Sequence, residues 1–169
     1  IQTNAGEKGW IYDGATLVIR EQGADEIENF KRGIRTSLDS LLRGAWRTQG
    51  ANLSYVGKRE AGLGKRNDVV KLIYSDGFTV EFEFSPDGMP MKSIYKKKNE
   101  EGAEIKEEDR FAQFVEIQGV LVPFIVDHFI DGKQTSRINY DKIEFNKKVP
   151  DSIFDKPSDV KMLKKDLKF

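Results

Sequence analysis

Short turn signals recur about every ten residues between Asn52 and Asn146, and they constrain the fold more than any other feature of this sequence. Each contains residues typical of hairpin loops: Ser75-Asp76-Gly77, Ser85-Pro86-Asp87-Gly88, Asn99-Glu100-Glu101-Gly102, Gln118-Gly119 and Asp131-Gly132. The runs between them are rich in Val, Ile, Phe and Tyr, and several alternate apolar with polar residues. This pattern predicts an antiparallel meander with strands near 52–59, 68–74, 78–84, 89–98, 104–117, 120–130 and 134–146.

One amphipathic helix is predicted before the meander, over residues 24–46. Its apolar residues are spaced three and four apart and therefore form one stripe: Ile27, Phe30, Ile34, Leu38, Leu41, Leu42 and Ala45. Residues 1–20 have the pattern of a short hairpin that turns at Asp13-Gly14. The predicted fold class is mainly β with one long helix (α+β), a curved antiparallel meander with the helix packed on its concave face.

Loop length fixes part of the strand register. A three-residue loop with Gly77 in the left-handed conformation sets Leu72 opposite Val80, and Val70 opposite Phe82. A two-residue loop would instead set a lysine opposite Phe82. We prefer the first register because it collects the apolar side chains on one face of the sheet.

The next loop then sets Phe84 opposite Met89 and Phe82 opposite Met91. The resulting apolar face holds Val70, Leu72, Tyr74, Phe78, Val80, Phe82, Phe84, Met89 and Met91. This face has two interpretations, a core packed under the helix or the lining of a cavity for an apolar ligand. Phe and Met suit both, because Met adapts to irregular shapes.

The strand 120–130 differs from the others because it is apolar on both faces. Val120, Val122, Phe124 and Val126 point one way, whereas Leu121, Ile125 and Phe129 point the other way. A strand of this kind is expected to be covered on both sides. A two-residue turn at Gln118-Gly119 would pair Ile117 with Val120.

Composition excludes several classes of function. The 28 basic and 28 acidic residues give a net charge of zero, which offers no electrostatic case for binding nucleic acid. The absence of cysteine excludes disulfides, thiol catalysis and zinc–thiolate sites. No segment is apolar enough to span a membrane, so we expect contact with a membrane to be peripheral at most.

No residue pattern indicates catalysis, a metal site or a cofactor. His128 is the only histidine, and its neighbour Asp127 should point to the opposite face of the strand, so we expect a structural or surface role. The basic run Lys96-Lys97-Lys98 should face the acidic residues of 100–109 across a hairpin. We interpret that hairpin as solvated, with a docking surface for a partner protein as the alternative.

Three segments resemble one family of bacterial envelope proteins. Residues 114–124 (FVEIQGVLVPF) are similar to the strand pair "y.e.dGv.lPf" of outer-membrane lipoprotein-sorting proteins. Residues 143–154 (IEFNKKVPDSIF) resemble the terminal signature "i.iN..vpds.F" of that family, and 6–10 (GEKGW) resemble its mid-chain "dG..gW" strand. These LolA-like proteins are periplasmic carriers built as an unclosed β-barrel with helices in its mouth.

The resemblance implies a non-enzymatic carrier that binds lipoprotein acyl chains or lipid in a hydrophobic cavity. The ligand-lining residues expected on this basis are Leu72, Val80, Phe82, Phe84, Met89, Met91, Phe124, Phe30 and Ile34. The alternative is an envelope scaffold of the same fold, with a filled core and a protein partner. Cavity volume separates the two, because a carrier needs several hundred Å³ of apolar space.

The resemblance also implies a location and a domain organisation. We expect a periplasmic or outer-membrane-associated protein of a Gram-negative bacterium. The expected organisation is a single LolA-like half-barrel domain over 1–169, with a C-terminal tail at 155–169. The family has further strands and a helix before its "gW" segment, so this chain is expected to be an N-terminally truncated product.

Overall fold

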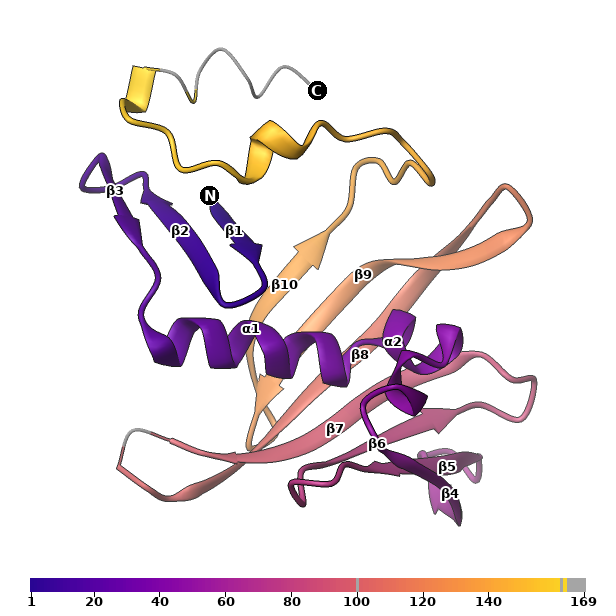
Figure 1. The fold of residues 1–169 in the computed structure, drawn as a ribbon. Helices are drawn as coiled ribbons and strands as arrows, with labels where there is room; N and C mark the ends of the chain where they lie inside the picture. The colour runs from indigo at the N-terminus through magenta and orange to yellow at the C-terminus, as the bar shows by residue number, and fades with distance from the viewer. Residues whose placement is uncertain (100, 162, 164–169) are drawn as a thin grey trace. The chain divides into compact units, whose positions relative to one another are not determined.

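The computed structural model describes residues 1–99, 101–161 and 163 (Figure 1). By internal contacts the chain divides into two compact units, each described below by itself. The first unit comprises Ile1–Ile34 with Glu144–Phe169, and the second comprises Arg35–Ile143. The organisation as one domain over 1–169 stays a prediction, and residues 162 and 164–169 of the predicted tail lie outside the described residues.

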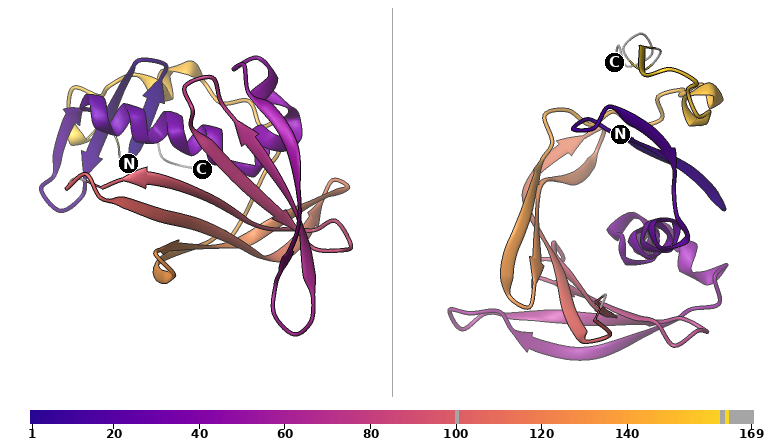
Figure 2. Two further views of the ribbon diagram at one scale, coloured as in Figure 1. Left: turned by 90° about the horizontal axis from the view of Figure 1, so that it is seen from below. Right: turned by 90° about the vertical axis from the view of Figure 1, so that its left-hand side faces the viewer.

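The second unit is built on a seven-stranded antiparallel sheet whose strand order follows the chain, β10-β9-β8-β7-β6-β5-β4. The strands are β4 (Asn52–Glu60), β5 (Arg66–Ile73), β6 (Thr79–Phe84), β7 (Pro90–Lys98), β8 (Glu104–Ile117), β9 (Val120–Ile130) and β10 (Lys133–Asn139). The sheet curves strongly, and β4 and β10 are its two edges, so it does not close into a barrel (Figure 2). This confirms the predicted curved, unclosed meander.

The predicted register is confirmed at the hairpin between β5 and β6. Leu72 pairs with Val80 and Val70 pairs with Phe82, and Gly77 has a φ of 84° in the intervening turn. That left-handed conformation is easily adopted by glycine because it lacks a Cβ.

The register predicted for the β8–β9 hairpin is confirmed, and the register predicted for the β6–β7 hairpin is wrong. Ile117 pairs with Val120, as the two-residue turn predicted. Phe84, however, pairs with Pro90 and not with Met89, so the turn is one residue longer than predicted. Phe82 pairs with Ser93 and not with Met91, because the ladder shifts by one further residue between Glu83 and Phe84. Such a bulge inserts one extra residue in one strand, and here it displaces Met91 from the predicted position.

The predicted single helix is two helices, α1 (Ala24–Thr36) and α2 (Leu38–Arg43), followed by the short 3₁₀ helix η1 (Ala45–Arg47). The break lies at Ser37, whose backbone is extended (φ −73°, ψ 143°) and whose hydroxyl accepts a hydrogen bond from the Ser40 N–H at 3.1 Å. Serine competes with helical backbone bonds in this way and favours an N-cap over a helix interior. The apolar stripe continues across the break, which is why periodicity alone predicted one helix.

The core of the second unit lies between α2, η1 and strands β5 and β6. Leu41 packs there with Ala51, Leu72, Tyr74, Val80 and Phe82, and Leu38, Trp46, Val70, Phe78, Phe84 and Tyr95 border this cluster. Leu72, Val80 and Phe82 are almost completely buried. Full burial of each such side chain contributes about 1.5–3 kcal/mol. The predicted contact of Leu38 and Leu41 with this face is confirmed, and that of α1 with the sheet stays a prediction.

Arg35 anchors the start of the second unit. Its guanidinium donates two hydrogen bonds to the carboxylate of Asp76, at 2.7 and 2.8 Å, and lies 3.9 Å above the centre of the Tyr74 ring. The Tyr74 hydroxyl donates to the backbone carbonyl of Arg35 at 3.0 Å. The Arg35 contact, with a backbone hydrogen bond from Phe78, lowers the pKa of Asp76 to about 2.

The first unit contains a three-stranded meander, β1 (Gln2–Ala5), β2 (Lys8–Asp13) and β3 (Val18–Glu21), and the 3₁₀ helix η2 (Asp151–Phe154). The predicted hairpin at Asp13-Gly14 is therefore present, with one further strand before it. Trp10 is buried, and its indole N–H donates to the backbone carbonyl of Phe154 at 3.0 Å. This bond joins two segments that carry the sequence resemblance and lie at opposite ends of the chain.

Candidate functional site

One face of the seven-stranded sheet carries both apolar and polar groups. We call it the α2 face, because α2 packs on its β5 and β6 portion. Strand pairing extends this face across the sheet, from Val80 through Tyr95 and Glu107 to Ile130. Since alternate residues of a strand share a face, the face has three zones. They are the core under α2, a polar band on β7, β8 and β9, and an apolar patch on β8, β9 and β10.

The polar band consists of Ser93, Tyr95, Lys97, Glu107, Asp109 and His128. Its centre is Glu107, which is buried and accepts a hydrogen bond from the Tyr95 hydroxyl. The Lys97 ammonium lies 2.5 Å from a Glu107 oxygen. His128 places Nδ1 at 2.7 Å from Asp109 Oδ1 and Nε2 at 3.8 Å from Glu107 Oε2. The Lys97 ammonium and the Tyr95 hydroxyl thus stabilise the Glu107 carboxylate, which would otherwise be costly to bury.

The band does not have the geometry of a nucleophilic triad. In such a triad the histidine lies between the nucleophile and the acid. Here Ser93 pairs across the ladder with Asp109, and His128 lies on the far side of Asp109. No group of three His, Cys, Asp or Glu side chains suited to a metal ion occurs in the described part of the chain.

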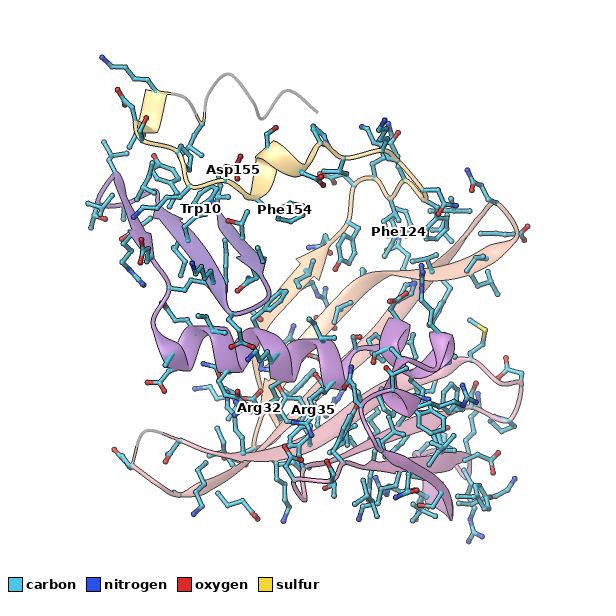
Figure 3. The ribbon with its side chains drawn as sticks, viewed as in Figure 1. Trp10, Arg32, Arg35, Phe124, Phe154 and Asp155 are labelled. Carbon is cyan, nitrogen blue, oxygen red and sulfur yellow. The ribbon has the colours of Figure 1, made fainter. Side chains whose placement is uncertain are left out.

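The distal apolar patch consists of Phe111, Val115, Val120, Val122, Phe124, Val126 and Ile138. Its members are half-buried or exposed, in contrast to the core under α2, and Val115 and Ile138 are among the exposed large apolar residues. Figure 3 labels Phe124 on β9. The patch is large enough for an extended apolar chain, because the six intervals from Val120 to Val126 along β9 span about 20 Å.

The opposite face of β9 is only partly covered. Leu121 is 53% exposed there, whereas the guanidinium of Arg110 lies 3.7 Å above the centre of the Phe129 ring. Asp127 also lies on this face and accepts hydrogen bonds from the Arg137 guanidinium at 2.6 and 2.8 Å. Asp127 and His128 therefore point to opposite faces, as their positions in the strand predicted.

The sequence-predicted lining residues fall into four places. Leu72, Val80 and Phe82 lie in the core under α2, and Phe84 borders it. Met89 and Met91 lie at the β6–β7 hairpin and bulge, half-buried and exposed respectively. Phe124 lies in the distal patch. Phe30 and Ile34 lie on α1, in the first unit, and both are exposed. Their role in ligand binding stays a prediction.

Sequence reasoning missed the polar band. It assigned the acidic residues of 100–109 to a solvated hairpin, and part of that prediction is confirmed by the Lys96–Glu104 ion pair at 2.6 Å. Glu107 and Asp109 are two residues apart in β8, however, and both therefore face the side on which His128 lies. Applying the Gln118-Gly119 register to His128 would have placed it opposite Asp109.

The first unit contains a separate cavity of about 430 Å³. Its walls come from β1, β2, β3, α1, the end of η2 and the residues next to these elements: Ala5, Glu7, Lys8, Gly9, Trp10, Glu21, Gln22, Ile27, Phe154, Asp155 and Lys156. Figure 3 labels Trp10, Phe154 and Asp155. Two ion pairs border it, Lys31 with Glu7 at 2.7 Å and Lys156 with Glu21 at 3.4 Å.

The described helices include none long and apolar enough to cross a membrane. Comparison with family models and with curated proteins gives no match. Among solved structures, the chain is similar to a crystal structure from Vibrio parahaemolyticus that is described as an outer membrane lipoprotein-sorting protein domain. The TM-score is 0.56 and the sequence identity 12%, over 88% of this chain and 64% of that one. The predicted likeness to the lipoprotein-sorting, LolA-like fold is thereby confirmed, and this chain spans less than two thirds of that structure.

Proposed function

We propose that this protein is a non-enzymatic carrier that binds the acyl chains of a lipoprotein or lipid on the distal apolar patch around Phe124. Its fold is that of a domain described as lipoprotein-sorting, which supports this class of function. The single observation that carries the proposal is the solvent-accessible apolar surface on the α2 face. We place the protein in the periplasm, or associated with the outer membrane, of a Gram-negative bacterium.

The size of the patch supports an acyl ligand. One leaflet of a bilayer is about 15 Å of hydrocarbon, half of the roughly 30 Å core, and this is the length of an acyl chain along its normal. The patch runs about 20 Å along β9. Each methylene removed from water contributes about 0.8 kcal/mol, so binding needs no covalent chemistry.

The core under α2 would contribute to the site only if α2 moved. Leu72, Val80 and Phe82 are buried beneath Leu41 and have no free apolar surface to offer. We therefore propose that Phe124 and its neighbours form the first contact, and that α2 acts as a lid over the remaining predicted lining residues.

This filled core favours a second candidate function. An envelope scaffold needs no cavity, and a packed β5–β6 face under α2 is what such a protein requires. In that case the distal patch would bind an envelope protein partner and not lipid.

A charge scan of one strand separates the two functions. Phe124→Asp places a carboxylate within the patch, and Leu121→Asp is the matched control because Leu121 is exposed on the opposite face of β9. Phe82→Asp places the charge in the core. Each variant is measured by thermal melting and by binding of a fluorescent fatty acid.

A carrier predicts that Phe124→Asp melts close to the parent but loses the probe, because an unpaired charge buried under an acyl chain costs several kcal/mol. Leu121→Asp should bind normally. Phe82→Asp should not fold, since total stability is only about 5–15 kcal/mol. Normal probe binding by a folded Phe124→Asp protein refutes the proposed site, and a parent that never binds the probe favours the scaffold.

A further inference from the structure

We propose that the cavity of the first unit binds a short peptide segment, recognised through its backbone amide group by the side chain of Gln22. This site is separate from the distal apolar patch and does not depend on lipid binding. Its volume of about 430 Å³ lies within the usual range of ligand sites, about 300–1,000 Å³.

The state of Gln22 is the observation that points to a ligand. Gln22 lines the cavity and is only 9% exposed, and neither its amide oxygen nor its amide nitrogen has a hydrogen-bond partner among the described residues. Buried side-chain polar atoms are nearly always hydrogen-bonded, because an unsatisfied amide loses its bonds to water without replacement. A group that enters the cavity can supply the missing partners.

The surrounding chain holds Gln22 in place. Its backbone N–H donates to the carbonyl of Gly9 at 2.9 Å, next to the β2–β3 ladder. A Cβ on Gly9 would lie 2.5 Å from the backbone oxygen of Thr3 and 2.4 Å from Gln22 Oε1, so a side chain there would clash with the backbone and displace the amide. The chain thus leaves space for the Gln22 amide, but no described residue forms a hydrogen bond with that amide.

The chemistry of the walls selects the ligand class. A primary carboxamide offers one acceptor and two donors, which complements the N–H and C=O of a peptide group. Trp10, Ile27 and Phe154 supply apolar wall for a side chain. The carboxylates of Glu7 and Glu21 already pair with lysines, and the other two charged wall residues, Lys8 and Asp155, have opposite signs, so the walls do not select a strongly charged ligand.

The test compares two probes on the full chain. The first is N-acetyl-leucine N-methylamide, a minimal peptide with an apolar side chain. The second is its isostere with both amide N–H groups replaced by ester oxygens. Binding is followed by NMR, from the side-chain amide of Gln22 and the indole N–H of Trp10. The same titration is run on Gln22→Met, which keeps side-chain length without hydrogen bonding, and on the control Gln49→Met, at an exposed glutamine of the second unit.

We expect the peptide probe to shift both signals and to bind about tenfold more tightly than the ester, the factor that one hydrogen bond supplies. Gln22→Met should lose this preference, and Gln49→Met should keep it. Equal binding of the two probes by the parent, or no shift of either signal, overturns the proposal. The comparison of the two probes on the parent holds even if Gln22→Met does not fold.

Discussion

The replacement Glu83→Gln should destabilise the protein far more than a surface glutamate would. Glu83 lies on β6, on the face opposite to α2, and its side chain is 0% exposed. Its carboxylate accepts hydrogen bonds from Arg59 at 2.9 Å and from Asn67 at 3.1 Å, and the Lys92 ammonium lies at 3.4 Å. Three donors therefore converge on two oxygens.

Glutamine has the same shape but only one acceptor oxygen, so its amide N–H₂ must face at least one of these donors. Hydrogen bonds to charged groups contribute about 1.5–3 kcal/mol each, and breaking a buried ion pair costs about 3–5 kcal/mol. Arg59 is 40% exposed and can regain water, which lowers the cost. We expect the free energy of unfolding to fall by about 2–4 kcal/mol.

The assay is a thermal melt of Glu83→Gln beside Glu60→Gln, whose glutamate is exposed on β4 next to Arg59. A loss of 2–4 kcal/mol corresponds to a Tm lower by roughly 5–15 °C for a chain of this size, whereas the control should change by less than about 2 °C. Adding Arg59→Met to Glu83→Gln should cost less than the sum of the two single changes, because the pair is already broken. A Glu83→Gln protein that melts with the parent would refute this account of the cluster.

Two further predictions concern local contacts. Because the pKa of Asp76 is lowered to about 2 from an ordinary value near 3.8, its contact with Arg35 stabilises the folded state above about pH 4. That stability should be lost as the pH falls toward 2, and Asp76→Asn should remove this part of the pH dependence in acid titrations followed by circular dichroism. The effect is at most about 1 kcal/mol, since Asp76 is largely solvent-screened. Ser37→Ala removes the N-cap of α2 and should cost about 0.5–2 kcal/mol in denaturant unfolding, with Ser37→Asp restoring most of it; equal stability of Ser37→Ala and the parent would contradict the capping role.

Strand positions and part of the register could be predicted from the sequence because they depend on local chemistry. Gly77 and Gly119 both adopt positive φ in tight turns, and the residues that flank them pair as loop length requires. The bulge at Met91 could not be predicted in the same way. It depends on how two strands accommodate each other, and no glycine or loop-length signal marks it in the sequence.

The burial of charged groups was the larger failure of the sequence-based prediction. Glu107 lies in a charged stretch predicted to be solvated, and Glu83 lies between two phenylalanines with no partner indicated by the sequence, yet both are buried. Their partners come from other strands: Arg59 on β4 reaches Glu83 on β6, and Tyr95 on β7 reaches Glu107 on β8. These partners come together only when the pairing of all the strands is known. The pattern of one strand taken alone therefore predicts that both glutamates are exposed.

The sequence pattern predicted one continuous apolar face, which could be either a filled core or the lining of a cavity. The polar band divides this face, so the two interpretations can apply to different parts of it. Glu107, with its ion-pair partners, lies between the core around Phe82 and the patch around Phe124. An acyl chain crossing this band would separate Glu107 from Lys97 or Tyr95, and an unpaired buried carboxylate is far more costly than a few methylenes are favourable. The ligand should therefore stay on the β8–β10 side, and Phe124 and Phe82 should respond differently to the same charge.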